Sequence, residues 1–273
     1  MKMSKNVSVG YQATDPIFGP FALWLAQLCK IDKRMHVLDV GCGIGVSTFP
    51  LLEKVGRTGK VMGLDISPDL ISQALEMAVK VGVSNISFMV GNAEQLDFPD
   101  NTFDSVMSNF VLRQVNDKVK ALQEMKRVLK PGGHLGFTLS GSDHYKEFRS
   151  MAAMVLKEDL FRPRQNCLRT DPDALPLLLE KSQITNIKSR SKTITLRINS
   201  VEKYDAILET RGPKKMILSR IKEERRGEIW KEILNELGEK LEKEGRLYMT
   251  IHASAIIWRK PLVDPIQNKN SDT

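Results

Sequence analysis

The strongest constraint on the fold is a β-like run that leads directly into a loop with three glycines, at residues 37–45. The run reads V-L-D-V, the loop reads G-C-G-I-G, and a helical pattern starts at Val46. Glycines let the backbone pass close to a bound ligand, because side chains there would collide with it. The following helix begins with free N–H groups that face the same crevice. The segment therefore predicts a nucleotide-like cofactor pocket at the end of a strand.

Strand-like and helix-like segments alternate from about residue 16 to residue 140. After a leading helix over 17–28, we expect strands at 36–40, 60–65, 86–90, 103–108 and 134–139, and helices at 46–55, 68–81 and 117–129. Pro131-Gly132-Gly133 is interpreted as the turn into the fifth strand. Strands that alternate with helices of this length predict right-handed βαβ units and a doubly wound parallel sheet.

The pattern changes after Ser140. We expect a helix over 143–160, a helix over 171–181 capped by Asp171, a strand over 187–198, charged helices over 200–244 and a last strand over 247–258. Gly212-Pro213 and Gly227 are interpreted as breaks between the charged helices. This organisation predicts a helical cover (1–34), a cofactor-binding core (35–140), a helical lid with the last two strands of the same sheet (141–260) and a flexible tail (261–273).

Composition excludes several classes of protein. The chain has 273 residues, of which 41% are hydrophobic and 27% charged, as in an ordinary globular protein. No apolar run approaches the roughly 20 residues that span a bilayer, and no apolar segment follows the basic N-terminus as in a signal peptide. Cys29, Cys42 and Cys167 are widely scattered, which favours reduced thiols in the cytoplasm and offers no metal site.

The formal net charge of +8 resides mainly in the segments that flank the expected core. A basic surface attracts nucleic acid or anionic substrates, although a solvated surface of mixed charge is the simpler interpretation. The sequence has no appended RNA-binding module and no strip of alternating basic and aromatic residues. We therefore expect a small-molecule acceptor in place of nucleic acid, no membrane span, and a monomer or homodimer.

Polar residues at the ends of later strands make the cofactor prediction more specific. A glycine-rich turn alone could equally serve a dinucleotide. Asp65, however, ends the second strand, where a carboxylate can accept hydrogen bonds from both ribose hydroxyls. Asn92 follows the third strand, where a polar side chain could contact an adenine amino group. The loop also lacks the G-x-x-G spacing that accommodates a pyrophosphate, which favours a nucleoside without phosphates.

These segments together resemble the class I S-adenosylmethionine-dependent methyltransferases. The matching stretches are V-L-D-V-G-C-G-I-G, G-L-D-I-S, G-N-A-E-Q-L-D-F-P-D-N-T-F-D-S-V and R-V-L-K-P-G-G, in family order across roughly residues 35–140. The resemblance implies a Rossmann-like sheet of seven strands with the last one antiparallel, covered by a helical lid. It also implies that the cofactor is S-adenosylmethionine, which becomes S-adenosylhomocysteine after methyl transfer.

The resemblance assigns roles to individual residues. It places the glycine loop (Gly41, Cys42, Gly43 and Gly45) beside the methionine and ribose parts of the cofactor, with Asp39 supporting the loop and Cys42 as a small residue within it. The remaining cofactor contacts are Asp65 at the ribose, Ile66 on the adenine, Asn92 and Ala93 at the adenine edge, and Asn109 with Phe110 near the methionine.

The reaction asks for in-line positioning of a nucleophile against the methyl group, and a carbon or oxygen nucleophile also needs a base. His144 follows the fifth strand on the productive side of the expected sheet, so it is the candidate base; an ordinary loop histidine is the alternative. The candidate substrate contacts are Tyr11, Phe18, Arg113 and Arg164.

The acceptor is less constrained by sequence. The segment N-F-V-L-R-Q-V at residues 109–115 is similar to G-F-G-L-R-N-V in menaquinone and ubiquinone biosynthetic C-methyltransferases, although their aromatic terminal signatures are not evident. A similarity to arsenite methyltransferases fails because Phe110 stands where they have a cysteine. We expect O- or C-methylation of a quinone-like acceptor or secondary metabolite. The alternatives are an RNA or protein methyltransferase, and a catalytically silent cofactor-binding partner of another enzyme.

Overall fold

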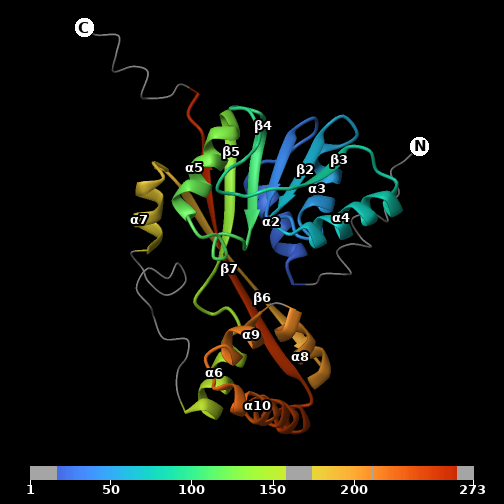
Figure 1. The fold of residues 1–273 in the computed structure, drawn as a ribbon, viewed down its shortest axis with the longest axis vertical. Coiled ribbons are helices and arrows are strands. Elements are labelled where there is room, and N and C mark those ends of the chain that lie inside the picture. The colour runs from blue at the N-terminus through green and yellow to red at the C-terminus, as the bar shows by residue number, and fades with distance from the viewer. Residues whose placement is uncertain (1–16, 158–173, 211, 263–273) are drawn as a thin grey trace. The chain divides into compact units, whose positions relative to one another are not determined.

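The structure is a computed structural model, and it describes residues 17–157, 174–210 and 212–262. The chain divides into two compact units (Figure 1). Unit 1 comprises Met1–Leu139, Pro172–Ser191 and Ala253–Thr273, and unit 2 comprises Ser140–Asp171 and Lys192–His252. The two units are described separately below.

Seven strands form one sheet, in the order β3-β2-β1-β4-β5-β7-β6. Their bounds are β1 His36–Val40, β2 Lys60–Asp65, β3 Ile86–Val90, β4 Phe103–Asn109, β5 Leu129–Ser140, β6 Lys188–Ile198 and β7 Leu247–Arg259. β1 is parallel to β2 and β4, with Val37 opposite both Val61 and Ser105. The predicted doubly wound sheet is confirmed.

The last strand runs antiparallel to its neighbour, as expected. The carbonyl of Gly133 accepts a hydrogen bond from the N–H of Lys260 at 2.9 Å, and the carbonyl of His252 accepts one from the N–H of Gly141 at 2.8 Å. Residue numbers therefore rise along β5 while they fall along β7, which is the antiparallel arrangement.

Unit 1 contains α2 (Gly19–Leu28), α3 (Thr48–Val55), α4 (Pro68–Val81), α5 (Lys118–Val128) and α7 (Ala174–Lys181). Local capping explains several of these bounds. Ser67 Oγ accepts a hydrogen bond from the Leu70 N–H at the start of α4, and Gly82 ends that helix in the left-handed conformation. The carboxylate of Asp117 caps α5 in the same way, by accepting from the Lys120 N–H.

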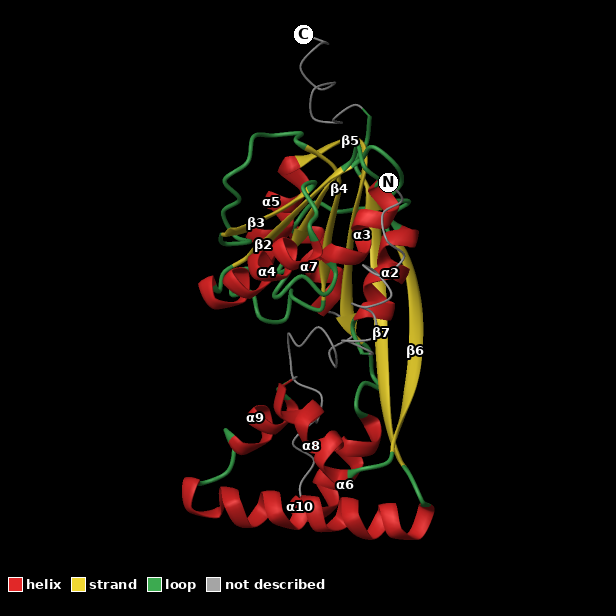
Figure 2. Ribbon diagram, turned by 90° about the vertical axis from the view of Figure 1, so that its right-hand side faces the viewer, coloured by secondary structure: helices red, strands yellow, loops and turns green. Residues whose placement is uncertain are grey.

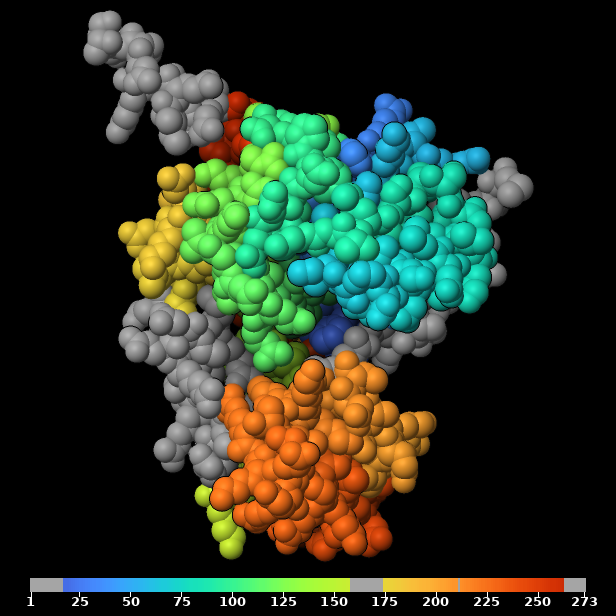
Figure 3. Space-filling model, in the orientation of Figure 1, coloured from blue at the N-terminus to red at the C-terminus, as the bar shows by residue number. Residues whose placement is uncertain are grey.

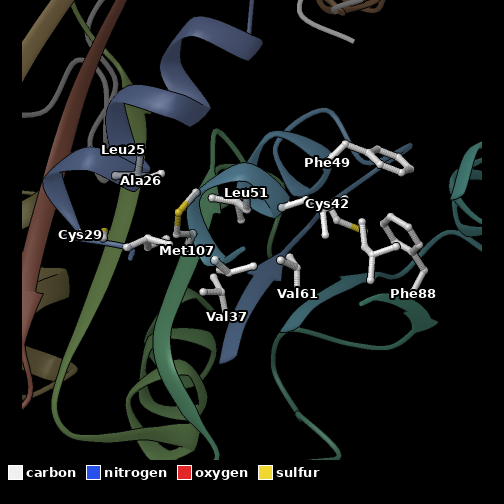
Figure 4. Packing of buried hydrophobic residues seen from close by; sticks show 14 of the residues in the cluster. Leu25, Ala26, Cys29, Val37, Cys42, Phe49, Leu51, Val61, Phe88 and Met107 are labelled. Carbon is white, nitrogen blue, oxygen red and sulfur yellow. The ribbon is translucent and has the colours of Figure 1, made fainter. Parts of the chain in front are cut away.

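The apolar faces of α2, α3 and α4 share one cluster of buried residues with the sheet. Figure 4 shows Leu25 and Ala26 of α2, and Cys29 directly after this helix, beside Met107 of β4. None of the buried residues of α5 belongs to this cluster. The strand order reverses at β1, and right-handed crossovers then place α5 on the opposite face. The C-terminal ends of β1 and β4 consequently border the crevice where ligands bind in such sheets.

The expectation that Pro131-Gly132-Gly133 precedes the fifth strand was wrong. These residues lie inside β5, where the register with β4 shifts from Phe103–Leu129 to Ser105–His134. β5 therefore gains extra residues relative to β4, as in a β-bulge. Gly132 permits the bulge because its φ is +80°, and its N–H donates to the carbonyl of Lys260 at 2.8 Å.

Unit 2 contains α6 (Lys146–Leu156), α8 (Val201–Thr210), α9 (Pro213–Leu218) and α10 (Glu223–Glu244). Figure 2 shows α10 as a long continuous helix, and Figure 3 shows in orange the surface that α8 to α10 present to the viewer. Phe148 of α6 packs against Trp230 of α10, with ring centroids 6.2 Å apart. Lys214 lies 4.9 Å from the centre of the Trp230 ring and pairs with Asp205 and Glu209.

The expected break at Gly227 was also wrong. α10 passes through this residue without interruption, because Ile229, Trp230 and Ile233 anchor the helix by burial. An exposed glycine costs a helix only about 1 kcal/mol, which such packing outweighs. The break at Gly212-Pro213 is confirmed, since α9 begins at Pro213. The predicted cap of Asp171 lies outside the described residues.

No helix in the described ranges combines the length and the apolar character that crossing a bilayer requires.

Candidate cofactor site

The glycine loop leaves β1 with three residues in the left-handed region of φ: Gly41 at +76°, Gly43 at +54° and Gly45 at +92°. A Cβ atom on Gly41 would lie 2.3 Å from the Val111 side chain, and one on Gly45 would lie 2.5 Å from the Phe49 ring. A Cβ on Gly43 would meet no atom of the described residues within 4 Å. Gly41 and Gly45 are therefore needed for packing, whereas Gly43 faces open space that a ligand can fill.

Asp39 lies completely buried in β1, beneath the glycine loop. Thr48 Oγ1 donates a hydrogen bond to its Oδ2 at 2.7 Å, and no described group hydrogen-bonds Oδ1. Burial raises the pKa of Asp39 to about 7. Burial, with Asp39 and Asp65 nearby, also raises the pKa of the Cys42 thiol well above its usual range. Cys42 thus behaves as a small apolar residue of the loop, and a thiolate role is disfavoured.

Asp65 connects the glycine loop to the start of α4. Its Oδ2 accepts the Gly43 N–H at 2.8 Å, and its Oδ1 accepts the Ser67 N–H at 3.0 Å. A carboxylate offers about four acceptor positions, so these two bonds leave capacity for ligand hydroxyls. The neighbouring Ile66 is 71% exposed, an unusual exposure for a large apolar side chain at a strand end.

The loop after β3 carries Asn92 and Ala93. Asn92 is exposed, and its Oδ1 accepts the Glu94 N–H at 2.9 Å, while Ala93 is nearly buried. Oε1 of Glu94 accepts the N–H groups of Asn116 and Asp117, at the N-terminus of α5, at 3.0 and 3.1 Å. The Asn92 loop is therefore tied to one end of α5.

The other end of α5 holds the same loop through Arg127. All five guanidinium N–H groups of this residue are used. They donate to both carboxylate oxygens of Glu124, to the carbonyls of Leu96 and Phe98, and to Asp100 Oδ1, at 2.7 to 2.8 Å. Glu124 additionally accepts the Leu96 N–H at 2.8 Å. The motif R-V-L-K-P-G-G contains Arg127, but nothing in the motif indicates these long-range partners.

Asn109 lies at the end of β4 and is the centre of a second hydrogen-bond network. Its Oδ1 accepts from Thr138 Oγ1 of β5 at 2.7 Å, and its Nδ2 donates to Ser47 Oγ at 3.2 Å. Nδ2 also lies 3.5 Å from the carbonyl of Phe18, which precedes α2. Asn109 of β4 thus joins three other segments that are distant in sequence, at the switch point of the sheet. Sequence reasoning missed Thr138 and Ser47 because single hydroxyls in these positions form no recognisable motif.

Phe110 follows with a φ of +62°, which is rare for a bulky residue and costs about 1–3 kcal/mol. Its N–H donates to Thr138 Oγ1 at 2.9 Å, which holds the backbone in this conformation. The ring packs 5.0 Å from Phe18 and 5.5 Å from Phe21. The predicted site residues Phe18, Asn109 and Phe110 are therefore brought together.

The remaining predicted residues are not part of this cluster. Arg113 is exposed in the segment that follows β4. His144 lies in unit 2, buried against Tyr145, with its Nδ1 3.1 Å from the carbonyl of His252. Tyr11 and Arg164 lie outside the described residues. Within the ranges that the structure covers, no group of three or more His, Cys, Asp or Glu side chains is arranged to hold a metal ion.

Comparisons with known proteins place this geometry in a family. Residues 31–161 match the profile of a family described as a methyltransferase domain. The demethylmenaquinone methyltransferase of Listeria monocytogenes is 41% identical over 109 residues, which make up 40% of this chain and 46% of that protein. The enzyme of the same name from Staphylococcus aureus is 35% identical over 161 residues, covering 57% of this chain and 66% of the relative. The chain thus spans about half the length of the Listeria relative.

The crystal structure of the YcgJ protein from Bacillus subtilis has the same fold, with a TM-score of 0.56 and 20% identity, covering 88% of this chain and 97% of that one. At this identity the likeness establishes the fold alone. Residues 31–161 of this chain therefore form an S-adenosylmethionine-dependent methyltransferase domain.

Proposed function

We propose that this chain binds S-adenosylmethionine at the end of β1 and transfers its methyl group to a small organic acceptor. The observation that supports this most directly is the environment of Gly43. This residue donates its N–H to Asp65, yet its α-carbon faces open space. A backbone exposed in this way, next to a carboxylate with spare acceptor capacity, suits a ribose that lies against the loop.

In this proposal residues 35–140 form the cofactor-binding core, and residues 141–260 contribute the lid. Asp65 holds the ribose hydroxyls, the exposed side chain of Ile66 packs on the adenine, and Asn92 with Ala93 contacts the adenine edge. Asp39 supports the loop from beneath, and Cys42 is a small residue within the loop. Asn109 and Phe110 border the methionine end.

The bound sulfonium supplies both the methyl group and its own leaving group, so the protein mainly needs to orient the two reactants and exclude water. The aromatic rings of Phe18, Phe21 and Phe110, which pack together at the end of β4, would exclude water there. His144 is the proposed base where the acceptor must lose a proton.

The aromatic surface made by Phe18 and Phe110 favours a flat, apolar acceptor, since such rings stack well on aromatic side chains. The names of the Listeria and Staphylococcus relatives agree with a quinone-like molecule. Tyr11, Arg113 and Arg164 are the further proposed substrate contacts.

Calorimetry with S-adenosylhomocysteine tests the cofactor assignment. Asp65→Ala should weaken binding at least tenfold, because a hydrogen bond to a charged group contributes about 1.5–3 kcal/mol. Asp65→Asn, which keeps one acceptor oxygen, should lose less. Asp69→Ala removes an exposed carboxylate from the first turn of α4 and should leave the affinity unchanged. Equal affinities of the wild type and Asp65→Ala would contradict the ribose contact.

The acceptor class has its own test. Methyl transfer to hydroxylated or quinone-like aromatic compounds should proceed without macromolecules and depend weakly on salt. Turnover that required tRNA and fell steeply between 50 and 200 mM salt, roughly the range in which phosphate contacts weaken, would contradict a small acceptor.

A further inference from the structure

Thr138 occupies an unusual position in unit 1. It is completely buried near the end of β5, and its single hydroxyl serves two groups of the neighbouring strand. It donates to Asn109 Oδ1 at 2.7 Å and accepts from the Phe110 N–H at 2.9 Å. One side chain therefore fixes both the orientation of the Asn109 amide and the left-handed backbone of Phe110.

The orientation of the amide has consequences beyond β4. With Oδ1 committed to Thr138, the Nδ2 group of Asn109 must point the other way, toward Ser47 Oγ at 3.2 Å and the Phe18 carbonyl at 3.5 Å. Ser47 is the residue immediately before α3, so it borders the glycine loop. By orienting the Asn109 amide, the Thr138 hydroxyl thus sets the contacts of β4 with Ser47, before α3, and with Phe18, before α2.

This network lies on one side of β1 only. Asn109 and Thr138 are on β4 and β5, whereas Asp65 and Asn92 lie at the ends of β2 and β3, across β1 in the strand order. A ligand that spans the crevice meets the Thr138 network with one end and Asp65 with the other. The two ends can therefore be perturbed separately.

We propose that Thr138 is a positioning residue of the methyl-donor site, acting through Asn109 and the left-handed backbone of Phe110 on the amino-acid end of the cofactor. This inference rests on the proposed function, because it takes S-adenosylmethionine as the ligand that spans the crevice. Thr138 itself need not touch the ligand.

Calorimetry of Thr138→Val with two ligands tests the proposal. Valine keeps the shape of threonine and removes the hydroxyl, so S-adenosylhomocysteine should bind at least fivefold more weakly. Adenosine reaches only the Asp65 side, and its affinity should change less than twofold. Thr138→Ser restores the hydroxyl and should bring S-adenosylhomocysteine affinity back to within twofold of the wild type.

Ser105→Ala is the matched control. Ser105 is also completely buried, and its hydroxyl donates to the His134 carbonyl at 3.0 Å, linking the same pair of strands near their other end. This variant should lose stability as Thr138→Val does, yet keep both affinities. Equal weakening of both ligands by Thr138→Val, unchanged affinity for S-adenosylhomocysteine, or no rescue by serine would each overturn the proposal.

A double substitution tests the route through Asn109. In the Asn109→Ala background, Thr138→Val should add less than a twofold further loss, because the amide that it orients is already gone. Fully multiplicative losses would refute this route. Failure of the wild type to bind S-adenosylhomocysteine would instead overturn the proposed function itself, and the positioning role with it.

Discussion

Replacing Arg127 by methionine should destabilise unit 1 and loosen the loop that carries Asn92. Arg127 joins Leu96, Phe98 and Asp100 to α5, and all of its donors are used. Methionine retains the aliphatic stem and its packing, so the substitution removes the hydrogen bonds and the charge alone. The free energy of unfolding should fall, and S-adenosylhomocysteine should bind more weakly.

The expected loss of stability depends on how far Arg127 and its partners are exposed to solvent. The Arg127–Asp100 pair contributes little, because Asp100 is 68% exposed and such pairs contribute about 0.5 kcal/mol. Glu124 is only 19% exposed and Arg127 32%, so their other hydrogen bonds contribute more. We expect about 1–1.5 kcal/mol from the bidentate pair with Glu124, and about the same from the two bonds to the carbonyls of Leu96 and Phe98, after allowance for solvent. We expect a loss of about 3 kcal/mol, or roughly 6–12 °C in melting temperature.

The pH dependence gives a second, independent check. The hydrogen bonds from Arg127 are the main reason why the pKa of Glu124 lies below its ordinary value of 4.5. A carboxylate with a lowered folded-state pKa contributes stability above its ordinary pKa, and this contribution disappears as the pH falls through the folded-state value. The difference between wild type and Arg127→Met should therefore be largest near pH 7 and should decrease once the pH falls below about 5, where Glu124 begins to be protonated in the unfolded chain.

Urea unfolding at pH 7 and pH 4 measures these differences. Arg127→Lys should fall between wild type and Arg127→Met, since one ammonium group cannot reproduce the planar fork of five donors. Arg225→Met is the control, because the partner of the Arg225 side chain among the described residues is the exposed Glu228, at 3.8 Å. A loss no larger than that of Arg225→Met, or one that stayed constant down to pH 4, would refute the reasoning.

Two further predictions concern the glycine loop. Burial raises the pKa of the Asp39 carboxyl to about 7, so ionising it in the folded protein costs free energy that approaches about 4 kcal/mol. Asp39→Asn should therefore stabilise the protein increasingly as the pH rises from about 4 to about 7. Chemical denaturation curves that gave the same stability difference at every pH would argue against this. Gly43→Ala should fold, with a strain of about 1 kcal/mol, but weaken S-adenosylhomocysteine at least tenfold, whereas Gly45→Ala should chiefly lower the melting temperature because its Cβ meets the Phe49 ring. Calorimetry and thermal unfolding of the pair should separate the two effects, and normal binding by Gly43→Ala would exclude a ligand at that face.

The sequence predicted the strands and helices of unit 1 closely because their ends are set locally. α4 was expected at 68–81 and occupies Pro68–Val81, since Ser67 caps it and Gly82 terminates it. The extra residues of β5 could not be foreseen in the same way. A bulge at Pro131-Gly132-Gly133 depends on pairing with Lys260, which is more than 120 residues away in the chain. The same limit explains Gly227, whose helix is held by buried neighbours.

In the candidate site, too, the sequence predicts some residues and their partners and misses others. Gly43 and Asp65 belong to short motifs that can be recognised without any structure, because a left-handed loop and a strand-end carboxylate need particular residue types. Arg127 lies in a recognisable motif, but its partners at Leu96 and Phe98 emerge only when α5 packs beside the loop. Thr138 belongs to no motif, since many residue types suit a buried strand.

The left-handed backbone of Phe110 depends on contacts that the sequence does not predict. A bulky residue in the left-handed region costs the fold free energy, and the position would suit glycine or asparagine better. The strain persists because the Thr138 hydroxyl holds the Phe110 N–H and because the ring packs on Phe18. Glycine there would relieve the strain but remove the ring that closes the end of β4. Phe110 and Phe18 form the proposed acceptor surface, so an acceptor that stacked there would depend on the Thr138 hydroxyl, which holds the backbone of Phe110.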